Sequence, residues 1–179
     1  MKVIVPADSV STKSTIEAIA SISGPFYVRL TRPSTPIVYD SGFEYKLGRA
    51  NLLRDGNDVA IFACGIMVPE ALMAAESLKS SGISACVVDL HTVKPIDSDL
   101  IVECAQKCGR VVTAEEHNIM GGMGSAVAEV LGEKRPTIMK RVGVMDTFGE
   151  SGEAGELLKK YGLTSADIEQ AASRLVRGH

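Results

Sequence analysis

The chain has 179 residues, of which 45% are hydrophobic and 23% charged, with a formal net charge of −3; these values are typical of one globular domain or of one domain with a small appendage. The basic residues are scattered among acidic ones, which argues against nucleic-acid binding, and no apolar run approaches the roughly 20 residues of a membrane-spanning helix. The N-terminus, MKVIVPADS, is too short in apolar residues for a signal peptide, so we predict a cytoplasmic protein.

The first 42 residues predict a small β-α-β unit followed by a linker. A β-branched run at 3–7 indicates a strand, apolar residues at helical spacing within 8–22 indicate a helix, and FYVRL at 26–30 indicates a second strand. Two prolines, a glycine and several small polar residues between positions 31 and 42 are typical of an extended surface crossing. We therefore place a domain boundary there.

Beyond residue 42, short apolar runs alternate with amphipathic stretches. Strands are predicted at 59–65, 83–90, 110–116 and 137–144. Helices are predicted after Pro69 with an apolar stripe at 71, 72, 74, 75 and 78, at 98–107 after the cap Asp97, at 125–131, and at 165–176, where Thr164 and Asp167 resemble a capping box. Near-continuously apolar strands alternating with helices indicate a parallel sheet covered on both faces.

The stretch TAEEHNIMGGMGSAVAEVL, residues 113–131, holds most of the candidate chemistry. Glu115, Glu116 and His117 stand at the carboxyl end of a predicted parallel strand, where α/β proteins tend to place ligands. Because strand side chains alternate, Glu115 and His117 can share a face, and a Glu can hold an imidazole in one tautomer. The alternative, which we favour, is a polar strand end that hydrogen-bonds the turn after it.

Three glycines, Gly121, Gly122 and Gly124, lie between this strand and the next predicted helix. That is the setting of a phosphate or dinucleotide cradle, but neither G-x-G-x-x-G nor G-x-x-x-x-G-K-[ST] is present. Glycines also permit a positive-φ turn and close packing of a helix against a strand, and we favour this role. It predicts a positive φ at one of the three glycines at least, and a helix that begins at Ser125.

The remaining histidines and the cysteines do not form a metal-binding pattern. His91 follows another strand end and can interact with Asp89 or Lys94, although we expect packing or capping; His179 is the last residue and is expected to be mobile. A zinc site needs three or four convergent ligands, and no spacing here supplies them. We expect buried free thiols in a reducing compartment at Cys64, Cys86, Cys104 and Cys108.

Two arginines, Arg29 and Arg32, end the second predicted strand in YVRLTRP. The planar guanidinium donates two parallel hydrogen bonds and so suits a phosphate group. Two surface arginines bracketing a strand explain the same spacing equally well. The residues alone therefore indicate an α/β protein without a complete catalytic constellation.

The order of the segments resembles the C-terminal part of a transketolase, specifically the C-terminal subunit of the split, two-gene kind. The resemblance covers essentially the whole chain, and its most specific segments are AEEHNIMGGMGSAVAEVL and GVMDTFGESG. Shorter motifs such as KPID are shared across the thiamine-diphosphate enzyme superfamily. Matching stretches are also VIVPADSVSTKSTIEAIA, GPFYVRLTRP, LGRANLLRDGNDVAIFACGIMVPEALMAAESLKSSGISACVVDLHTVKPID and ELLKKYGLT.

The resemblance implies a three-layer α/β/α domain at residues 43–179, with a five-stranded, mostly parallel sheet that has one antiparallel edge strand. Residues 1–33 would be the C-terminal remnant of a pyrimidine-binding domain, and residues 34–42 the linker. The family's glutamate that activates the aminopyrimidine ring, its His-rich loop and its GDG motif for magnesium diphosphate are absent from the sequence. The resemblance thus implies a partial polypeptide that is inactive alone.

For the intact enzyme, the resemblance implies transfer of a two-carbon ketol unit between sugar phosphates in the pentose phosphate pathway. Thiamine diphosphate and Mg²⁺ would be the cofactors, and an N-terminal transketolase subunit or domain would be the partner within a homo-oligomer. Arg32, in the family pattern L-[ST]-R, would contact the sugar phosphate, although Pro33 follows it where many relatives have a polar residue. No catalytic, cofactor-binding or metal-binding residue is expected on this chain.

Two other functions are compatible with the sequence. One is a part of the E1 β component of a 2-oxoacid dehydrogenase, which would use the same domain to face a lipoyl-bearing partner. The other is a stand-alone regulatory or binding domain for a nucleotide or a protein. Assays with a ketose phosphate and a 2-oxoacid separate the enzymes, and thermal stabilisation by a nucleotide would indicate the regulatory domain.

Overall fold

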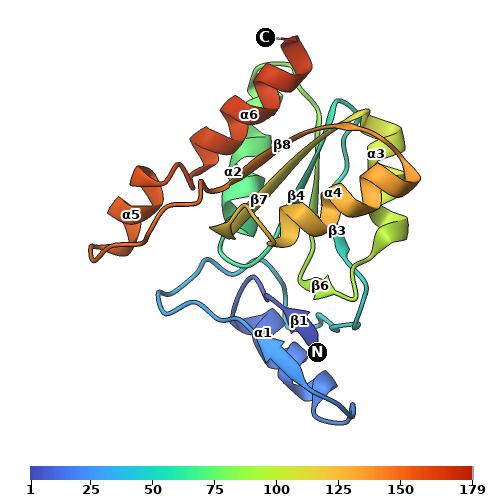
Figure 1. Cartoon of the computed structure of the whole chain (residues 1–179), viewed down its shortest axis with the longest axis vertical. Helices are drawn as coiled ribbons and strands as arrows, with labels where there is room; N and C mark the ends of the chain where they lie inside the picture. Colours follow the sequence, from blue (N-terminus) through green and yellow to red (C-terminus); the bar gives the residue numbers. More distant parts are fainter. Residues whose placement is uncertain (179) are drawn as a thin grey trace.

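The structure is a computed structural model that describes residues 1–178, and its larger part is built on a five-stranded sheet (Figure 1). The strand order is β3 (Asn51–Arg54), β5 (Ala85–Asp89), β4 (Val59–Ala63), β7 (Arg110–Asn118) and β8 (Ile138–Val144). Four strands are parallel and β3 runs antiparallel to β5 at one edge. Every residue of β4 and β5 is buried, which explains their continuous apolar sequences.

Four helices cover the two faces of this sheet (Figure 1). Helices α2 (Met67–Ser80) and α6 (Ser165–Arg177) pack on one face, and α3 (Ser98–Cys108) and α4 (Met123–Lys134) pack on the other. Each face has its own core of hydrophobic side chains. The predicted three-layer α/β/α class with one antiparallel edge strand is therefore confirmed.

Local signals for helix ends were good guides to the structure. The Asp97 side chain accepts a hydrogen bond from the Leu100 backbone N–H and caps α3, as predicted. Thr164 and Asp167 form the predicted capping box of α6. Pro69 lies in the first turn of α2, where its missing N–H leaves no hydrogen bond unmade.

The N-terminal residues form a separate three-stranded sheet below the larger one (Figure 1). Strand β1 (Lys2–Ile4) pairs in parallel with β2 (Phe26–Val28), and helix α1 (Ser9–Ile19) connects them, as the predicted β-α-β unit requires. The third strand, β6 (Thr92–Lys94), comes from the middle of the chain and pairs antiparallel with β1. Local sequence did not predict β6.

Asp8 connects α1 to the predicted linker. Its carboxylate caps α1 by accepting from the Ser11 N–H at 2.7 Å, and its other oxygen accepts from the backbone N–H groups of Val38 and Tyr39 at 2.7 and 3.0 Å. Burial raises the Asp8 pKa, but these hydrogen bonds outweigh it and leave the pKa below its ordinary value. The crossing contains no helix or strand between residues 31 and 42, yet Asp8 holds its path.

Residues 145–160, here called the projecting arm, leave the end of β8 and extend away from the sheet (Figure 1). The arm contains α5 (Ala154–Lys160), none of whose residues is fully buried. The Tyr161 hydroxyl donates to the Phe148 carbonyl oxygen at 3.1 Å, and Lys160 forms an ion pair with Glu150. These contacts give the arm a defined path although it adds little to the core.

Candidate functional site: the strand ends and the glycine turn

Glu115 organises the glycine turn. The residue is 2% exposed, and its two side-chain oxygens accept hydrogen bonds from the backbone N–H groups of Met123 at 2.6 Å and Gly124 at 2.8 Å. A carboxylate at this place satisfies N–H groups that the first helical turn leaves free, and it complements the positive end of the helix dipole. The strand end therefore hydrogen-bonds the turn, as we favoured from the sequence.

Two of the three glycines, Gly122 and Gly124, make room for this carboxylate, and the third permits the turn. A Cβ on Gly122 would lie 2.1 Å from the Glu115 Oε2 atom, and one on Gly124 would lie 2.7 Å from Thr113 Oγ1. Gly121 has a φ of +74°, which confirms the predicted positive-φ turn. Helix α4 begins at Met123 rather than at Ser125, so that prediction was wrong by two residues.

The start of α4 does not form a phosphate cradle, because the chain's own carboxylate occupies the position that an anion would take. Burial raises the Glu115 pKa, and the hydrogen bonds from the Gly124 and Met123 N–H groups oppose that rise. Glu115 thus serves as the N-terminal cap of α4.

Arg29 and Glu116 connect the small sheet to the large one. The Arg29 Nη2 atom lies 2.8 Å from Glu116 Oε2 and also donates to the Glu116 carbonyl oxygen. His117 is exposed, and its Nδ1 lies 2.8 Å from the Asn118 carbonyl oxygen. Glu115 and His117 line one cleft, as the strand alternation predicts, but no hydrogen bond joins them in the described structure.

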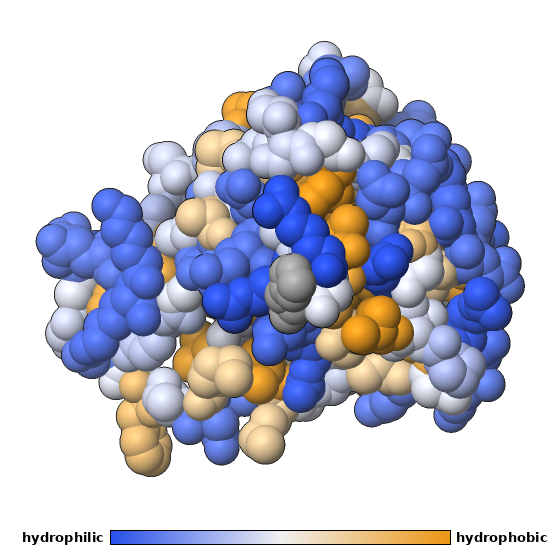
Figure 2. Space-filling model, turned by 90° about the horizontal axis from the view of Figure 1, so that it is seen from above, coloured by the Kyte–Doolittle hydropathy of each residue, from blue (hydrophilic) through white to orange (hydrophobic). Residues whose placement is uncertain are grey.

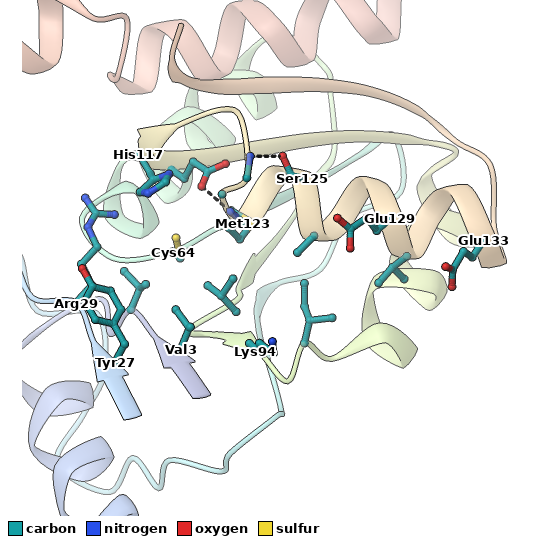
Figure 3. A pocket seen from close by; sticks show the side chains of 18 of the residues that line it. Val3, Tyr27, Arg29, Cys64, Lys94, His117, Met123, Ser125, Glu129 and Glu133 are labelled. Atoms are coloured by element: carbon teal, nitrogen blue, oxygen red, sulfur yellow. Dashed lines mark hydrogen bonds between the residues drawn. The ribbon is translucent and has the colours of Figure 1, made fainter. Parts of the chain in front are cut away.

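A cleft of about 630 Å³ lies between the small sheet and α4 (Figure 3). It stands outside the carboxyl ends of β4 and β7, neighbouring strands whose following helices cover opposite faces, which is the usual ligand position in an open α/β sheet. Aliphatic residues such as Val3, Val93 and Val130 form much of its wall. Cys64 points into it, but burial raises the pKa of this thiol far above neutrality and leaves it a poor nucleophile.

Arg32 has different surroundings from Arg29. It is exposed and lines a groove of about 650 Å³ beside the start of α1, together with Ser9, Thr12 and Lys13. Among the described residues, Arg32 has neither an ion-pair partner nor a hydrogen-bond partner for its side chain. The sequence spacing did not decide between phosphate binding and a pair of surface arginines. In the described structure Glu116 pairs with Arg29, whereas the side chain of Arg32 has no such partner.

His91 is packed rather than placed for catalysis. It is 1% exposed, its Nδ1 lies 3.0 Å from Thr92 Oγ1, and its ring lies against those of Tyr45 and Phe43. Neither predicted partner, Asp89 nor Lys94, hydrogen-bonds to it in the part of the chain that is described. Burial lowers the His91 pKa to about 4, so the ring is neutral at pH 7.

Asp89 was considered from the sequence only as a partner for His91, not as a buried carboxylate. It ends the buried strand β5 with 0% exposure, and its Oδ2 accepts from the Tyr39 hydroxyl at 2.7 Å. Burial raises its pKa to about 7, with a smaller upward contribution from the charge of Asp8. A carboxylate inside the apolar run ACVVDL was the available signal.

The cysteines are buried free thiols, as predicted. Cys86 and Cys104 have their sulfur atoms 3.7 Å apart, without a bond between them. Across residues 1–178, no group of three or more His, Cys, Asp and Glu side chains is placed to hold a metal ion. His179 lies outside the described residues. None of the described helices is both long and apolar enough to cross a membrane.

The structure is an α/β/α domain with an appended β-α-β unit. Glu115 has a structural role in the domain, and Arg32, which follows the appended unit, has no side-chain partner among residues 1–178. Residues 48–168 match the family model for the transketolase C-terminal domain. The chain belongs to the transketolase C-terminal domain family.

Individual relatives support the same assignment. The chain is 47% identical over 96% of its length to a 6-deoxy-6-sulfo-D-fructose transketolase subunit of Clostridium sp. (strain MSTE9), and 45% identical over 98% to a putative transketolase C-terminal section of Methanocaldococcus jannaschii. A solved split-gene transketolase, described as an inactive β4 tetramer, superposes on 99% of the chain with a TM-score of 0.96 and 47% identity. The chain spans 53%, 55% and 58% of these proteins, about half of their length.

Proposed function

We propose that this chain is the C-terminal portion of a transketolase, a transferase that moves a two-carbon ketol unit between ketose and aldose phosphates. The observation that carries the proposal is the superposition on a split-gene transketolase over 99% of the chain at 47% identity. The intact enzyme would act in the cytoplasm and in the pentose phosphate pathway.

Residues 1–33 would be the end of a pyrimidine-binding domain, residues 34–42 a linker, and residues 43–179 the C-terminal domain. An N-terminal transketolase subunit or domain would supply the remainder, and the assembled enzyme would be a homo-oligomer of such units. The naming of relatives as subunits or sections supports a separate partner. We infer that the chain alone is inactive.

Thiamine diphosphate and Mg²⁺ would serve the intact enzyme, but the residues described here do not fit them. No metal-holding cluster exists within residues 1–178, and Glu115 fills the helix start at the carboxyl edge of the sheet. A magnesium diphosphate needs oxygen ligands and free N–H donors, so another part of the enzyme must provide both.

Arg32 is the residue that we propose to bind the substrate's phosphate. Within residues 1–178 its side chain has no ion-pair or hydrogen-bond partner, and it shares a groove with Lys13; both observations support this role. The sulfosugar in the name of the Clostridium relative has a sulfonate, which is also a tetrahedral anion that an arginine can bind. We therefore propose a ketose with an anionic terminal group as the substrate class, with a phosphate preferred.

The test combines the purified chain with its N-terminal partner, thiamine diphosphate and Mg²⁺, and assays ketol transfer from a ketose phosphate to an aldose phosphate. Activity should need both proteins, and each alone should be inactive. A 2-oxoacid and a sulfosugar are run as parallel substrates. Turnover of the 2-oxoacid but not of the sugar substrates would instead indicate the dehydrogenase component. A higher melting temperature of the isolated chain with a nucleotide would indicate a regulatory domain.

A further inference from the structure

The projecting arm presents an aromatic side chain that the fold does not use. Phe148 is 99% exposed and Met145 is 65% exposed. The hydrogen bond from Tyr161 to the Phe148 carbonyl and the ion pair between Lys160 and Glu150 hold the backbone around them. Aromatic side chains are frequent binding hot spots, and because the backbone that carries Phe148 is already held, less backbone entropy is lost when the ring is buried.

The arm also has a net acidic surface. Glu153 and Glu156 are exposed, and neither has an ion-pair partner among the described side chains. Figure 2 shows the arm as a lobe at the left edge of the molecule with a mainly hydrophilic outer face. Its binding surface therefore combines an apolar anchor with unpaired negative charge.

A complementary surface lies next to the arm on the same chain. A groove of about 430 Å³, here called the edge groove, runs between β8 and α6. Two of its lining residues are the exposed cations Lys140 and Arg174. Neither has an ion-pair partner within the described structure. Its volume falls within the roughly 300–1,000 Å³ of ligand pockets, so it can hold an aromatic ring.

We propose that the arm of one copy docks in the edge groove of a second copy of this chain, and that the second copy's arm docks reciprocally. Phe148 would enter the groove, and Glu153 and Glu156 would face Lys140 and Arg174. This surface is distinct from the proposed substrate site, and the proposal does not depend on transketolase activity.

Three observations favour a second copy as the occupant. The charges on the arm and the groove are opposite in sign, which promotes association and sets orientation. Met145 and Tyr161 line the edge groove and also the hollow beside Phe148, so the two surfaces adjoin and one two-fold axis can satisfy both contacts at once. A relative that superposes at a TM-score of 0.96 is described as a tetramer of a single kind of chain.

The first test is sedimentation of the 179-residue chain over concentrations from about 1 to 100 µM, with masses compared with the 19.0 kDa of one copy. The wild type should associate, and Phe148→Ala should raise the dissociation constant about 30-fold, as the loss of an aromatic hot spot does. Met73→Ala serves as the matched control, because Met73 is 50% exposed on α2 and lies outside both surfaces. It should leave the dissociation constant unchanged.

The second test exchanges the charges. Lys140→Glu with Arg174→Glu makes the groove acidic, and Glu153→Lys with Glu156→Lys makes the arm basic. Each double variant should be monomeric alone, since it opposes like charges. Mixing the two should restore a heterodimer, because both of its arm-to-groove contacts then join opposite charges.

Circular dichroism of each variant confirms that these exposed substitutions leave the fold intact. A wild-type chain that stays at 19.0 kDa across the concentration range would overturn the proposal. Association of the Phe148 variant with wild-type affinity would overturn it as well, as would a mixture of the charge variants that remains monomeric. Recovery of the heterodimer would support the reciprocal geometry specifically.

Discussion

Replacing His91 by Phe, and separately Asp89 by Asn, should change the pH dependence of stability in opposite directions. Both residues are buried, at 1% and 0% exposure, and burial acts on their charged forms. It lowers the His91 pKa from 6.5 to about 4 and raises the Asp89 pKa from 3.8 to about 7. For each residue, the folded and unfolded pKa values bound a pH interval in which the two states bind different numbers of protons. These two intervals nearly coincide, from about pH 4 to about pH 7.

The two contributions have opposite signs. The unfolded state binds more protons at His91 between about pH 4 and 6.5, so this contribution is complete above about pH 6.5 and is lost as the pH falls to about 4. The folded state binds more protons at Asp89, so that contribution is complete below about pH 4 and is lost as the pH rises to about 7. At about 1.4 kcal/mol per pKa unit, the full effects are about 3 kcal/mol for His91 and about 4 kcal/mol for Asp89.

The wild type should therefore show little net slope from this pair, and each substitution should reveal the other residue's titration. Urea unfolding at about pH 4.5 and pH 7.5 measures the difference between variant and wild type. Asp89→Asn should be more destabilising at the acid pH, and His91→Phe more destabilising at the neutral pH. The phenyl ring keeps the packing against Tyr45 and Phe43 while removing the ionisable group.

Between about pH 4.5 and pH 7.5, the difference in unfolding free energy between each variant and the wild type should change by most of the values given above. The change is not complete because pH 4.5 lies slightly inside the titration interval. The absolute cost of each substitution also includes lost packing and hydrogen bonds. The pH-dependent part of the Tyr39–Asp89 hydrogen bond is already contained in the folded-state pKa of Asp89. Two differences that are flat between the two pH values would refute the reasoning, as would two that slope in the same direction. An NMR titration of the His91 ring provides an independent value for its pKa.

Four substitutions and one binding measurement provide further tests of the site and the fold. In the assembled enzyme, Arg32→Ala should weaken phosphorylated substrates by about 1.5–3 kcal/mol; an equal loss with non-phosphorylated substrates would remove Arg32 from the site. Gly121→Ala should cost about 1 kcal/mol through its positive φ. Gly122→Ala should lower the melting temperature more than Gly121→Ala does, because a Cβ at Gly122 displaces the Glu115 carboxylate. A larger loss of melting temperature for Gly121→Ala would contradict the capping role of Glu115. Asp8→Ala should cost about 0.5–2 kcal/mol of stability, because the helix cap is lost. This cost should shrink as the pH falls through the folded-state pKa of Asp8, which lies below its ordinary value. A cost that stays constant with pH would argue against an ionised cap. Calorimetry of the isolated chain with thiamine diphosphate and Mg²⁺ should show no micromolar binding, and a clear isotherm would show that the chain does hold the cofactor.

The strands and helices of the larger sheet were predictable because their signals are local. Runs such as VAIFACG and ISACVVDL are apolar throughout because both faces of the sheet are covered. Asp97 and the Thr164–Asp167 pair act on backbone groups within three residues, so their spacing alone reveals them. Strand β3 was implied only by the family resemblance.

The features that were missed depend on contacts between distant residues. Strand β6 is three residues long and exists because β1 pairs with it. Helix α5 has no fully buried residue and hence little periodic signal. The start of α4 is set by Glu115, eight residues before Met123, and a local rule expects a cap from the preceding residue.

The candidate site was less predictable than the fold for the same reason. Arg29 and Arg32 have similar local sequences, and they differ because Glu116 on β7 reaches only Arg29. Glu115 and His117 were correctly placed on one face, but the neighbouring helix start decides what Glu115 does.

The pairing of β6 with β1 has a consequence for how the molecule opens. Val3 and Ile4 pair with Lys94 and Thr92, and the Val5 N–H donates to the His91 carbonyl oxygen at 2.8 Å. Amide hydrogens on the two strands should therefore exchange with solvent together, in one cooperative event that also frees the start of the chain. A protease that cuts the crossing between residues 34 and 42 should leave two fragments that co-purify, because the cut removes the covalent link but leaves this shared sheet intact.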